Sequence, residues 1–247
     1  FLIAAVNILI GVSATLMASR QSKVSVQTEQ PAWIPAESRG DATTDRLVLA
    51  ALATSGFVSM VYEVAWTRAL AAMIGSSTYA FSIMLVTFLV GIALGSSIAV
   101  KWRGAGLRLL GLIQLGIAVG AVLFLVGYLV APYILLGMLR ALSYTFPAVL
   151  TSQFVVCASL MIFSTVCMGA AMPVASQIYS NKLTVLGRSV GNVYSVNTLG
   201  AIAGSLAAGF VLLPLLGTER AILAGLFVNS AMAALILAAP RASRRPN

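Results

Sequence analysis

Six apolar runs of membrane-spanning length follow one another through most of this chain. They cover residues 47–74, 77–100, 109–131, 148–178, 192–216 and 220–239. An α-helix rises 1.5 Å per residue, so about 20 apolar residues cross a hydrocarbon layer that is roughly 30 Å thick. Backbone groups in hydrocarbon must hydrogen-bond within the protein, which favours helices. The sequence therefore predicts an all-α, polytopic transmembrane helix bundle in contact with the lipid bilayer.

The composition supports this class and excludes several others. Hydrophobic residues make up 60% of the chain and charged residues 9%, and the mean hydropathy is +1.01. The net charge of +9 comes from basic residues scattered between apolar runs, without a basic face, so we expect no nucleic-acid partner. The chain has no histidine and only six acidic residues, most of them outside the runs. We therefore expect no metal site, no bound cofactor and no catalytic residue in this chain.

Changes in composition divide the chain into four parts. We expect residues 1–18 to form the last helix of a preceding membrane block, and residues 19–45 to form a polar cytoplasmic linker. Residues 46–240 predict a six-helix transmembrane block, followed by a basic cytoplasmic tail at 241–247. Within the block, the stretch Pro132–Pro147, which contains Arg140, predicts a short interfacial segment.

The basic residues fall unequally on the two sides of the predicted bundle. Counted over alternate loops, one side holds Arg20, Lys23, Arg39, Arg46, Lys101, Arg103, Arg108, Lys182, Arg188, Arg241, Arg244 and Arg245, and the other holds Arg140 and Arg220. Lysine and arginine accumulate in cytoplasmic loops. This bias predicts an N-terminus outside the membrane and a cytoplasmic C-terminus.

Glu63 lies in the middle of the first run of the block, where an ionisable group is costly and marks a functional site or an obligatory polar contact. Ser59, Met60 and Trp66 share its helix face at intervals of three and four residues. Arg68 lies five positions after Glu63, which places it poorly for pairing within the helix. Two interpretations remain open: a cation- or proton-coupled site in a translocation path, or a buried carboxyl group that hydrogen-bonds a neighbouring helix.

Small residues recur at intervals of four on three of the predicted helices. Such spacing lets helix backbones approach closely in membranes. The pairs are Gly91/Gly95, Gly116/Gly120 and Gly200/Gly204. We interpret them as helix-packing positions, and Asn197, on the same face as Gly200, as a candidate polar contact.

Two groups of motifs resemble the membrane domain of bacterial fused major-facilitator/spermidine synthase proteins. The first contains Tyr62–Arg68 (YEVAWTR) and Phe88–Gly95 (FLVGIALG), joined through Gly75-Ser76-Ser77. The second contains Gly191–Gly200 (GNVYSVNTLG) and 209–217 (GFVLLPLLG). The resemblance implies the second six-helix half of a major-facilitator-like fold in a bacterial inner membrane. The basic turn Gly95–Gly104 lacks the acidic residue that this superfamily carries there.

In the resembled family an aminopropyltransferase-like cytosolic domain follows the membrane part, and no segment of this sequence matches it. The expected function is thus a membrane anchor or assembly component of a spermidine-synthase-like protein, in contact with other membrane subunits or further blocks. The alternative is a transporter for a polyamine or another cationic solute that uses Glu63. For either function, the candidate intramembrane polar site comprises Glu63, Tyr62, Trp66, Arg68, Asn197 and Tyr194.

Overall fold

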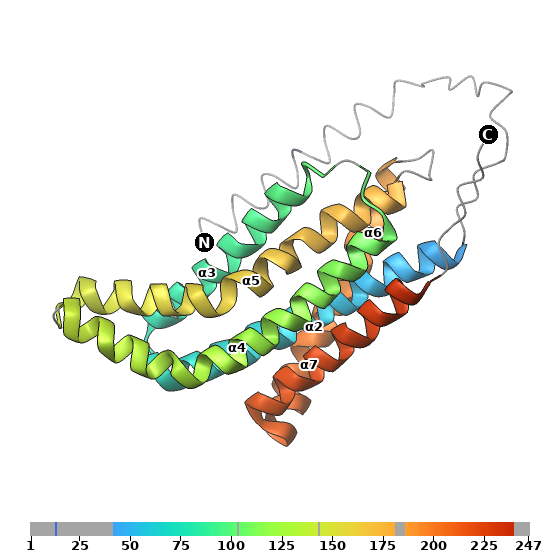
Figure 1. The fold of residues 1–247 in the computed structure, drawn as a ribbon. Helices are drawn as coiled ribbons and strands as arrows, with labels where there is room; N and C mark the ends of the chain where they lie inside the picture. The colour runs from blue at the N-terminus through green and yellow to red at the C-terminus, as the bar shows by residue number, and fades with distance from the viewer. Residues whose placement is uncertain (1–12, 14–41, 103, 143, 181–185, 240–247) are drawn as a thin grey trace, which may run out of the picture. The chain divides into compact units, whose positions relative to one another are not determined.

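A computed structural model of the chain describes residue 13 and residues 42–102, 104–142, 144–180 and 186–239. Across the last four of these ranges the chain forms long helices and no strand, which confirms the predicted all-α class for this part (Figure 1). The helices are α2 (Ala42–Ile74), α3 (Thr78–Ala99), α4 (Leu107–Leu142), α5 (Phe146–Ser180), α6 (Leu186–Ala207) and α7 (Leu213–Ala238). The predicted helix at 1–18, most of the linker and the basic tail lie outside the described residues.

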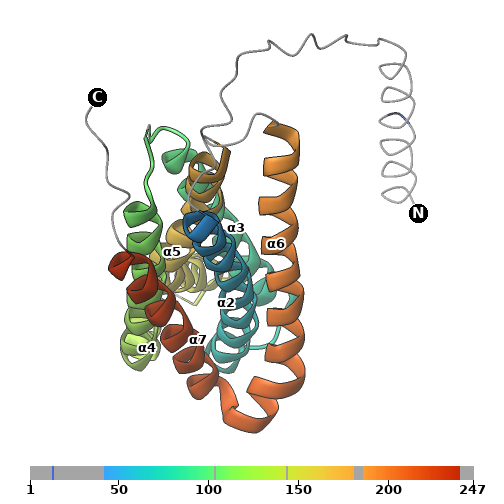
Figure 2. The same ribbon diagram turned by 90° about the vertical axis from the view of Figure 1, so that its right-hand side faces the viewer.

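Five described stretches are long and apolar enough to cross a membrane. The last of them, Gly191–Ala238, joins α6 to α7 through the π-helical turn η1 (Ala208–Leu212). Gly217 has a φ of 79°, which L side chains rarely adopt, and it breaks the helical path there. Figure 2 shows α6 and α7 running in opposite directions from this turn. The stretch is therefore two helices, in agreement with the six apolar runs.

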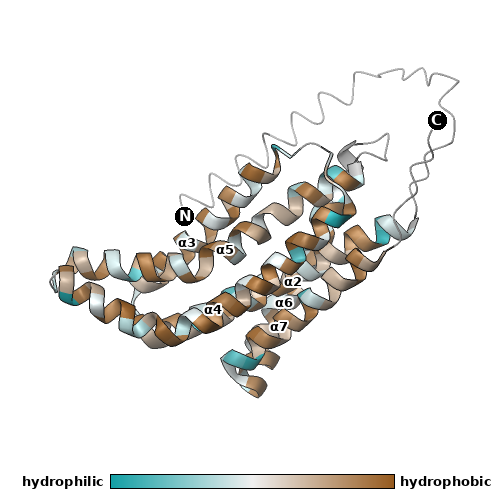
Figure 3. Ribbon diagram, viewed as in Figure 1, coloured by the Kyte–Doolittle hydropathy of each residue, from teal (hydrophilic) through white to brown (hydrophobic). Residues whose placement is uncertain are grey.

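Hydrophobic residues extend along every labelled helix, and hydrophilic ones gather mainly near helix ends (Figure 3). The turn between α2 and α3 illustrates how the sequence ends a helix. Gly75 has a φ of 91°, and the Ser77 hydroxyl accepts a 3.1 Å hydrogen bond from the backbone N–H of Ala80. Glycine permits the left-handed turn and serine caps the first turn of α3.

The predicted interfacial segment at Pro132–Pro147 is helical over most of its length. Helix α4 continues through Pro132 to Leu142, and α5 begins at Phe146. The 36 residues of α4 extend about 54 Å at 1.5 Å per residue. This length, measured along the helix, exceeds the roughly 30 Å thickness of a hydrocarbon layer. Neighbouring helices can compensate for the backbone hydrogen bond that a proline removes, which makes proline tolerable inside a membrane helix.

The helices pack in two matching sets of three. Helix α2 packs against α6 and α7, and helix α5 packs against α3 and α4. The sets correspond when α2, α3 and α4 are matched in this order with α5, α6 and α7. The α2–α6 contact then corresponds to the α5–α3 contact, and the α2–α7 contact to the α5–α4 contact. A shared motif lies at the two equivalent crossings: Gly91-x3-Gly95-Ser96 on α3 and Gly200-x3-Gly204-Ser205 on α6.

Glycines bring the backbones into direct contact at both crossings. A Cβ atom at Gly200 or Gly204 would collide with the backbone of Ala53 or Phe57 on α2. On the other side of the bundle, a Cβ at Gly95 would collide with the carbonyl group of Val166 on α5. These approaches leave no room for a methyl group, so each crossing depends on glycine.

The third glycine pair, Gly116 and Gly120 on α4, packs against α5 in a different way. A Cβ atom at the buried Gly120 would collide with the side chain of Ser164, and one at Gly116 would lie 2.8 Å from the Sγ atom of Cys167. The two glycines thus make room for small side chains of α5, whereas their spacing alone suggested an approach between backbones. Both positions lie in the α4–α5 interface, and Gly120 is closed to a larger residue by Ser164.

Polar side chains join the helices by donating hydrogen bonds to backbone carbonyl oxygens on other helices. The bonds are Ser96 Oγ to Gly169 O (2.9 Å), Gln114 Nε2 to Ala51 O (2.7 Å), Tyr128 Oη to Ala69 O (2.8 Å), Gln153 Nε2 to Ile74 O (3.2 Å) and Gln177 Nε2 to Ala99 O (3.3 Å). Together they join α2 to α4 and α5, and α3 to α5. Such bonds between membrane helices stabilise a bundle modestly and fix its register.

Candidate functional site

A cavity of about 180 Å³ lies among α2, α3, α5 and α6, on the two glycine crossings. Its polar lining residues are Ser55 and Ser59 of α2, Ser96 of α3 and Asn197 of α6. The Ser59 hydroxyl donates a 2.6 Å hydrogen bond to the carbonyl oxygen of Ser55. The remaining walls carry glycines and apolar side chains, among them Met60, Met168 and Met172. This central cavity combines hydroxyl and amide groups with flexible thioethers.

The crossing of α2 and α6 places Asn197 in this cavity. A Cβ atom at Gly56 would lie against the backbone carbonyl and 3.0 Å from the side-chain oxygen of Asn197. The Asn197 side chain makes no hydrogen bond to any described residue. Its amide therefore keeps both donors and its acceptor available at the cavity wall.

Glu63 lies one turn beyond Ser59 and Met60 on the same helix, next to the residues that line the central cavity. It is half-buried, and within the described helices its carboxyl group makes no hydrogen bond or ion pair. Arg68 is exposed and does not pair with it. The structure therefore brings Ser59 and Asn197 to one cavity, with Glu63 beside it, and leaves Arg68 apart.

Tyr62 and Trp66 belong to a different environment, a stack of aromatic rings between α2 and α4. The ring centroids of Tyr62 and Trp66 are 5.0 Å apart, as are those of Trp66 and Phe124, and those of Phe124 and Tyr128 are 6.0 Å apart. Both Tyr62 and Trp66 are fully buried. The ring of Tyr62 also lies against Gly225 of α7, where a Cβ atom would collide with it. These two side chains thus lie in the packed core, away from the central cavity.

Tyr194 lies on the outer surface of α6 with 62% of its area exposed. Its backbone carbonyl oxygen accepts a 2.8 Å hydrogen bond from the Thr198 hydroxyl, and its side chain forms no hydrogen bond with a described residue. In the part of the chain that is described, Tyr194 and Asn197 therefore face different surroundings although they are only three positions apart.

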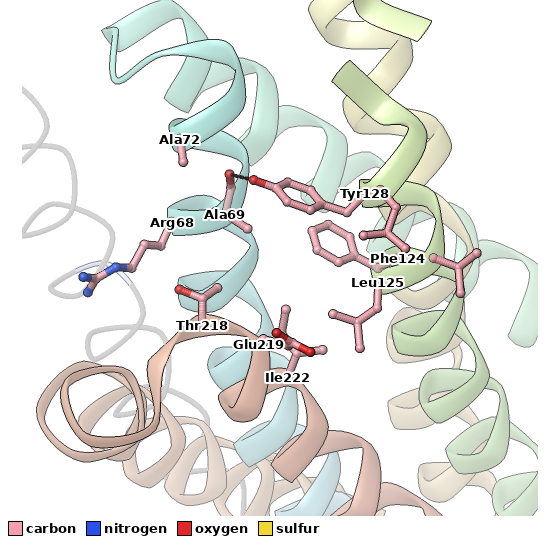
Figure 4. A pocket seen from close by; sticks show the side chains of 11 residues that line it. Arg68, Ala69, Ala72, Phe124, Leu125, Tyr128, Thr218, Glu219 and Ile222 are labelled. Atoms are coloured by element: carbon pink, nitrogen blue, oxygen red, sulfur yellow. Dashed lines mark hydrogen bonds between the residues drawn. The ribbon is translucent and has the colours of Figure 1, made fainter. Parts of the chain in front are cut away.

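A larger cavity, of about 540 Å³, lies between α2, α4 and α7 near the turn that contains Gly217. Arg68, Tyr128 and Glu219 are among the residues that line it (Figure 4). Sequence reasoning missed Phe124, Tyr128 and Glu219 in this role. The four-residue spacing of Phe124 and Tyr128, like that of Tyr62 and Trp66, is the sequence signal that both rings share a helix face.

The described residues contain no set of side chains placed to bind a metal ion. No group of three or more His, Cys, Asp or Glu side chains comes together there. Cys157 and Cys167 both lie on α5 and are free thiols. Comparisons of the chain with family models, curated proteins and solved structures gave no match.

Proposed function

We propose that this chain is a six-helix membrane domain that anchors and positions a larger protein or assembly. The observation that carries the proposal is the rigid construction of the two glycine crossings. Backbone contact at Gly95 and Gly204 fixes α3 on α5 and α6 on α2. Donor side chains such as Gln114 and Tyr128 bind backbone oxygens of neighbouring helices and do not line the central cavity.

The proposed parent protein is spermidine-synthase-like, and the domain corresponds to the second half of a major-facilitator-like fold. The motif resemblance in Tyr62–Arg68 and Gly191–Gly200 supports this assignment. The correspondence between α2-α3-α4 and α5-α6-α7 supports it as well, since each half of a major-facilitator protein contains two three-helix repeats of inverted topology.

The proposed location is the inner membrane of a bacterium, with the C-terminus in the cytoplasm. The bundle end where α2 begins and α3 passes to α4 carries Arg46, Lys101 and Arg108. The opposite end carries Arg140 and Arg220. Together with the other basic residues of the sequence, this distribution favours a cytoplasmic location for the end that carries Arg46, Lys101 and Arg108.

The anchor proposal is tested by the intact mass and terminal sequences of the protein isolated from its native membrane. We expect a mass well above the 25.7 kDa of this chain, with an additional soluble domain that binds a nucleoside cofactor. A mass equal to that of this chain, with no associated polypeptide, would contradict the proposal.

A second candidate function is transport of a cationic solute, and Glu63 is the observation that favours it. A carboxyl group without a described partner lies one turn from a cavity that contains Ser59 and Asn197. Intramembrane carboxyl groups of this kind serve as cation partners in transporters. The reference solute is radiolabelled putrescine or spermidine.

Uptake into proteoliposomes separates the two functions. If the protein is a transporter, uptake exceeds that of empty vesicles and is lost in Glu63→Gln. The control variant Arg140→Gln, which removes a charge at the exposed hairpin end, retains uptake. The anchor function predicts no uptake by any of the three proteins. Equal uptake by the wild-type protein and Glu63→Gln would exclude Glu63 as the cation partner.

A further inference from the structure

The cavity between α2, α4 and α7 has the dimensions of a small-molecule site. Its volume of about 540 Å³ lies within the range of roughly 300 to 1,000 Å³ found for ligand pockets. Phe124, Leu125 and Ile222 form its apolar walls. The Tyr128 hydroxyl is occupied by its hydrogen bond to the carbonyl oxygen of Ala69, drawn as a dashed line in Figure 4. The aromatic wall is therefore held in place.

The cavity opens toward the outer flank of the bundle. Val126 and Leu129 line it and are 59% and 72% exposed, respectively. Exposed apolar side chains on a membrane-spanning helix contact lipid. A molecule can therefore enter the cavity directly from the bilayer.

The polar groups of the cavity lie toward the bundle end that contains the α2–α3 and α6–α7 turns. Arg68 is six residues before the end of α2, and Thr218 and Glu219 directly follow Gly217. Tyr128 lies opposite them on α4. The apolar walls begin one turn deeper, at Phe124 and Ile222. A polar end near the membrane interface and an apolar interior match the two parts of an amphiphile.

The charged side chains of the cavity point in different directions. Figure 4 shows the Glu219 carboxyl group between α7 and α4, beside Ile222, and the Arg68 guanidinium extending away to the other side of α2. Glu219 forms no ion pair or hydrogen bond with the described residues. The cavity thus offers one carboxylate without a partner among the described residues, and a carboxylate attracts cations.

We propose that this cavity binds the primary ammonium group of a membrane amphiphile. Glu219 accepts its hydrogen bonds, Phe124 and Tyr128 line the headgroup, and the alkyl chain leaves between Val126 and Leu129. The amphiphile is an aminophospholipid or a free long-chain amine. The phosphate of an aminophospholipid adds an anion, for which Arg68 is the cation among the lining residues, whereas a free amine carries no anion. This site is separate from the central cavity and independent of the proposed anchor function.

Lipid binding to the purified full chain in detergent tests the proposal. The probes are phosphatidylethanolamine, phosphatidylglycerol with the same acyl chains but no ammonium group, and tetradecylamine. Retention is measured by native mass spectrometry and stabilisation by thermal unfolding. We expect preference for the two ammonium probes over phosphatidylglycerol. Glu219→Gln should weaken their binding about tenfold, because one charge-assisted contact is lost.

Three further variants separate the possible outcomes. Arg140→Gln removes a charge outside this cavity, at the exposed hairpin end, and should keep the preference. Ala72→Phe adds a ring at an exposed position of the lining and should reduce binding of both ammonium probes. If a phospholipid is the natural occupant, Arg68→Gln should weaken binding of phosphatidylethanolamine alone. If a free amine is the natural occupant, Arg68→Gln should weaken binding of neither ammonium probe. Equal binding of phosphatidylglycerol, or an unchanged preference in Glu219→Gln, would overturn the proposal.

Discussion

The side-chain amide of Gln114 donates a 2.7 Å hydrogen bond to the carbonyl oxygen of Ala51, and both residues are completely buried. The bond joins α4 to α2 close to the end of the bundle where both helices begin. The other amide atom, Gln114 Oε1, is buried without a hydrogen-bond partner. One side chain therefore combines a favourable contact with a desolvation cost, and the two nearly cancel in the free energy of unfolding.

Replacing Gln114 with leucine should change the free energy of unfolding by less than about 1 kcal/mol, because the lost bond and the removed unpaired oxygen offset each other. Gln114→Ala should cost about 2 to 4 kcal/mol, since it also opens a cavity. Reversible denaturation in mixed micelles measures both values. A leucine variant that is as unstable as the alanine variant would show that the hydrogen bond dominates.

The glycine crossings predict a sharp contrast between two identical substitutions. Gly204→Ala forces a methyl group into the backbone of Phe57 and should destabilise the bundle by about 1 to 3 kcal/mol. Gly137→Ala has no atom within 4 Å of the new Cβ and should stabilise α4 by up to about 1 kcal/mol, since alanine is the better helix former. Thermal unfolding of both variants in the same detergent gives the comparison. Similar shifts for the two would contradict direct contact between α2 and α6.

The sequence alone predicted the helices well, because their signals are local. The expected run 47–74 corresponds to α2 at Ala42–Ile74, and the run 148–178 to α5 at Phe146–Ser180. Apolar length fixes each helix, and turn residues such as Gly75 fix its end. For the segment after Pro132 the sequence predicted only an interfacial position and no helix, because its continuation as helix depends on packing of α4 beside α5, which no local pattern reports.

The candidate site was harder to predict, because helix rotation and crossing decide which side chains meet. Asn197 reaches the cavity beside Ser59 only through the close approach of α6 to Gly56. Trp66 shares a nominal face with Glu63, yet it stacks on Phe124 of α4. The position of Glu219 in the cavity between α2, α4 and α7 depends on the direction in which α7 continues after the turn at Gly217. These relationships need the tertiary structure.

The spacing of small residues likewise leaves open what each glycine meets. Gly120 and Gly204 belong to pairs with the same four-residue interval. In the structure, however, Gly120 faces the Ser164 side chain and Gly204 faces the Phe57 backbone. The interval predicts a close approach between helices, whereas the partner atoms depend on the register of the facing helix, which the spacing does not contain.

The aromatic stack predicts opposite effects for two tyrosine-to-phenylalanine substitutions. Tyr128→Phe removes the 2.8 Å hydrogen bond to Ala69 and should cost about 0.5 to 1.5 kcal/mol. Tyr62→Phe removes a buried hydroxyl that has no hydrogen-bond partner and should be neutral or stabilising by up to about 1 kcal/mol. Both variants keep the ring contacts, and denaturation in micelles reports the difference. Equal losses would mean that a bound water satisfies the Tyr62 hydroxyl.

Glu63 yields the prediction that best separates its two interpretations. The carboxyl group is half-buried and makes no hydrogen bond or ion pair with the described residues, so Glu63→Leu removes no contact within this part of the bundle. Removing a polar group from apolar surroundings is favourable. The variant should therefore unfold with a free energy unchanged or raised by up to about 1 kcal/mol, and Glu63→Gln should behave alike. A loss above about 2 kcal/mol in Glu63→Leu alone would instead identify Glu63 as a structural hydrogen-bonding group, since only glutamine could replace it.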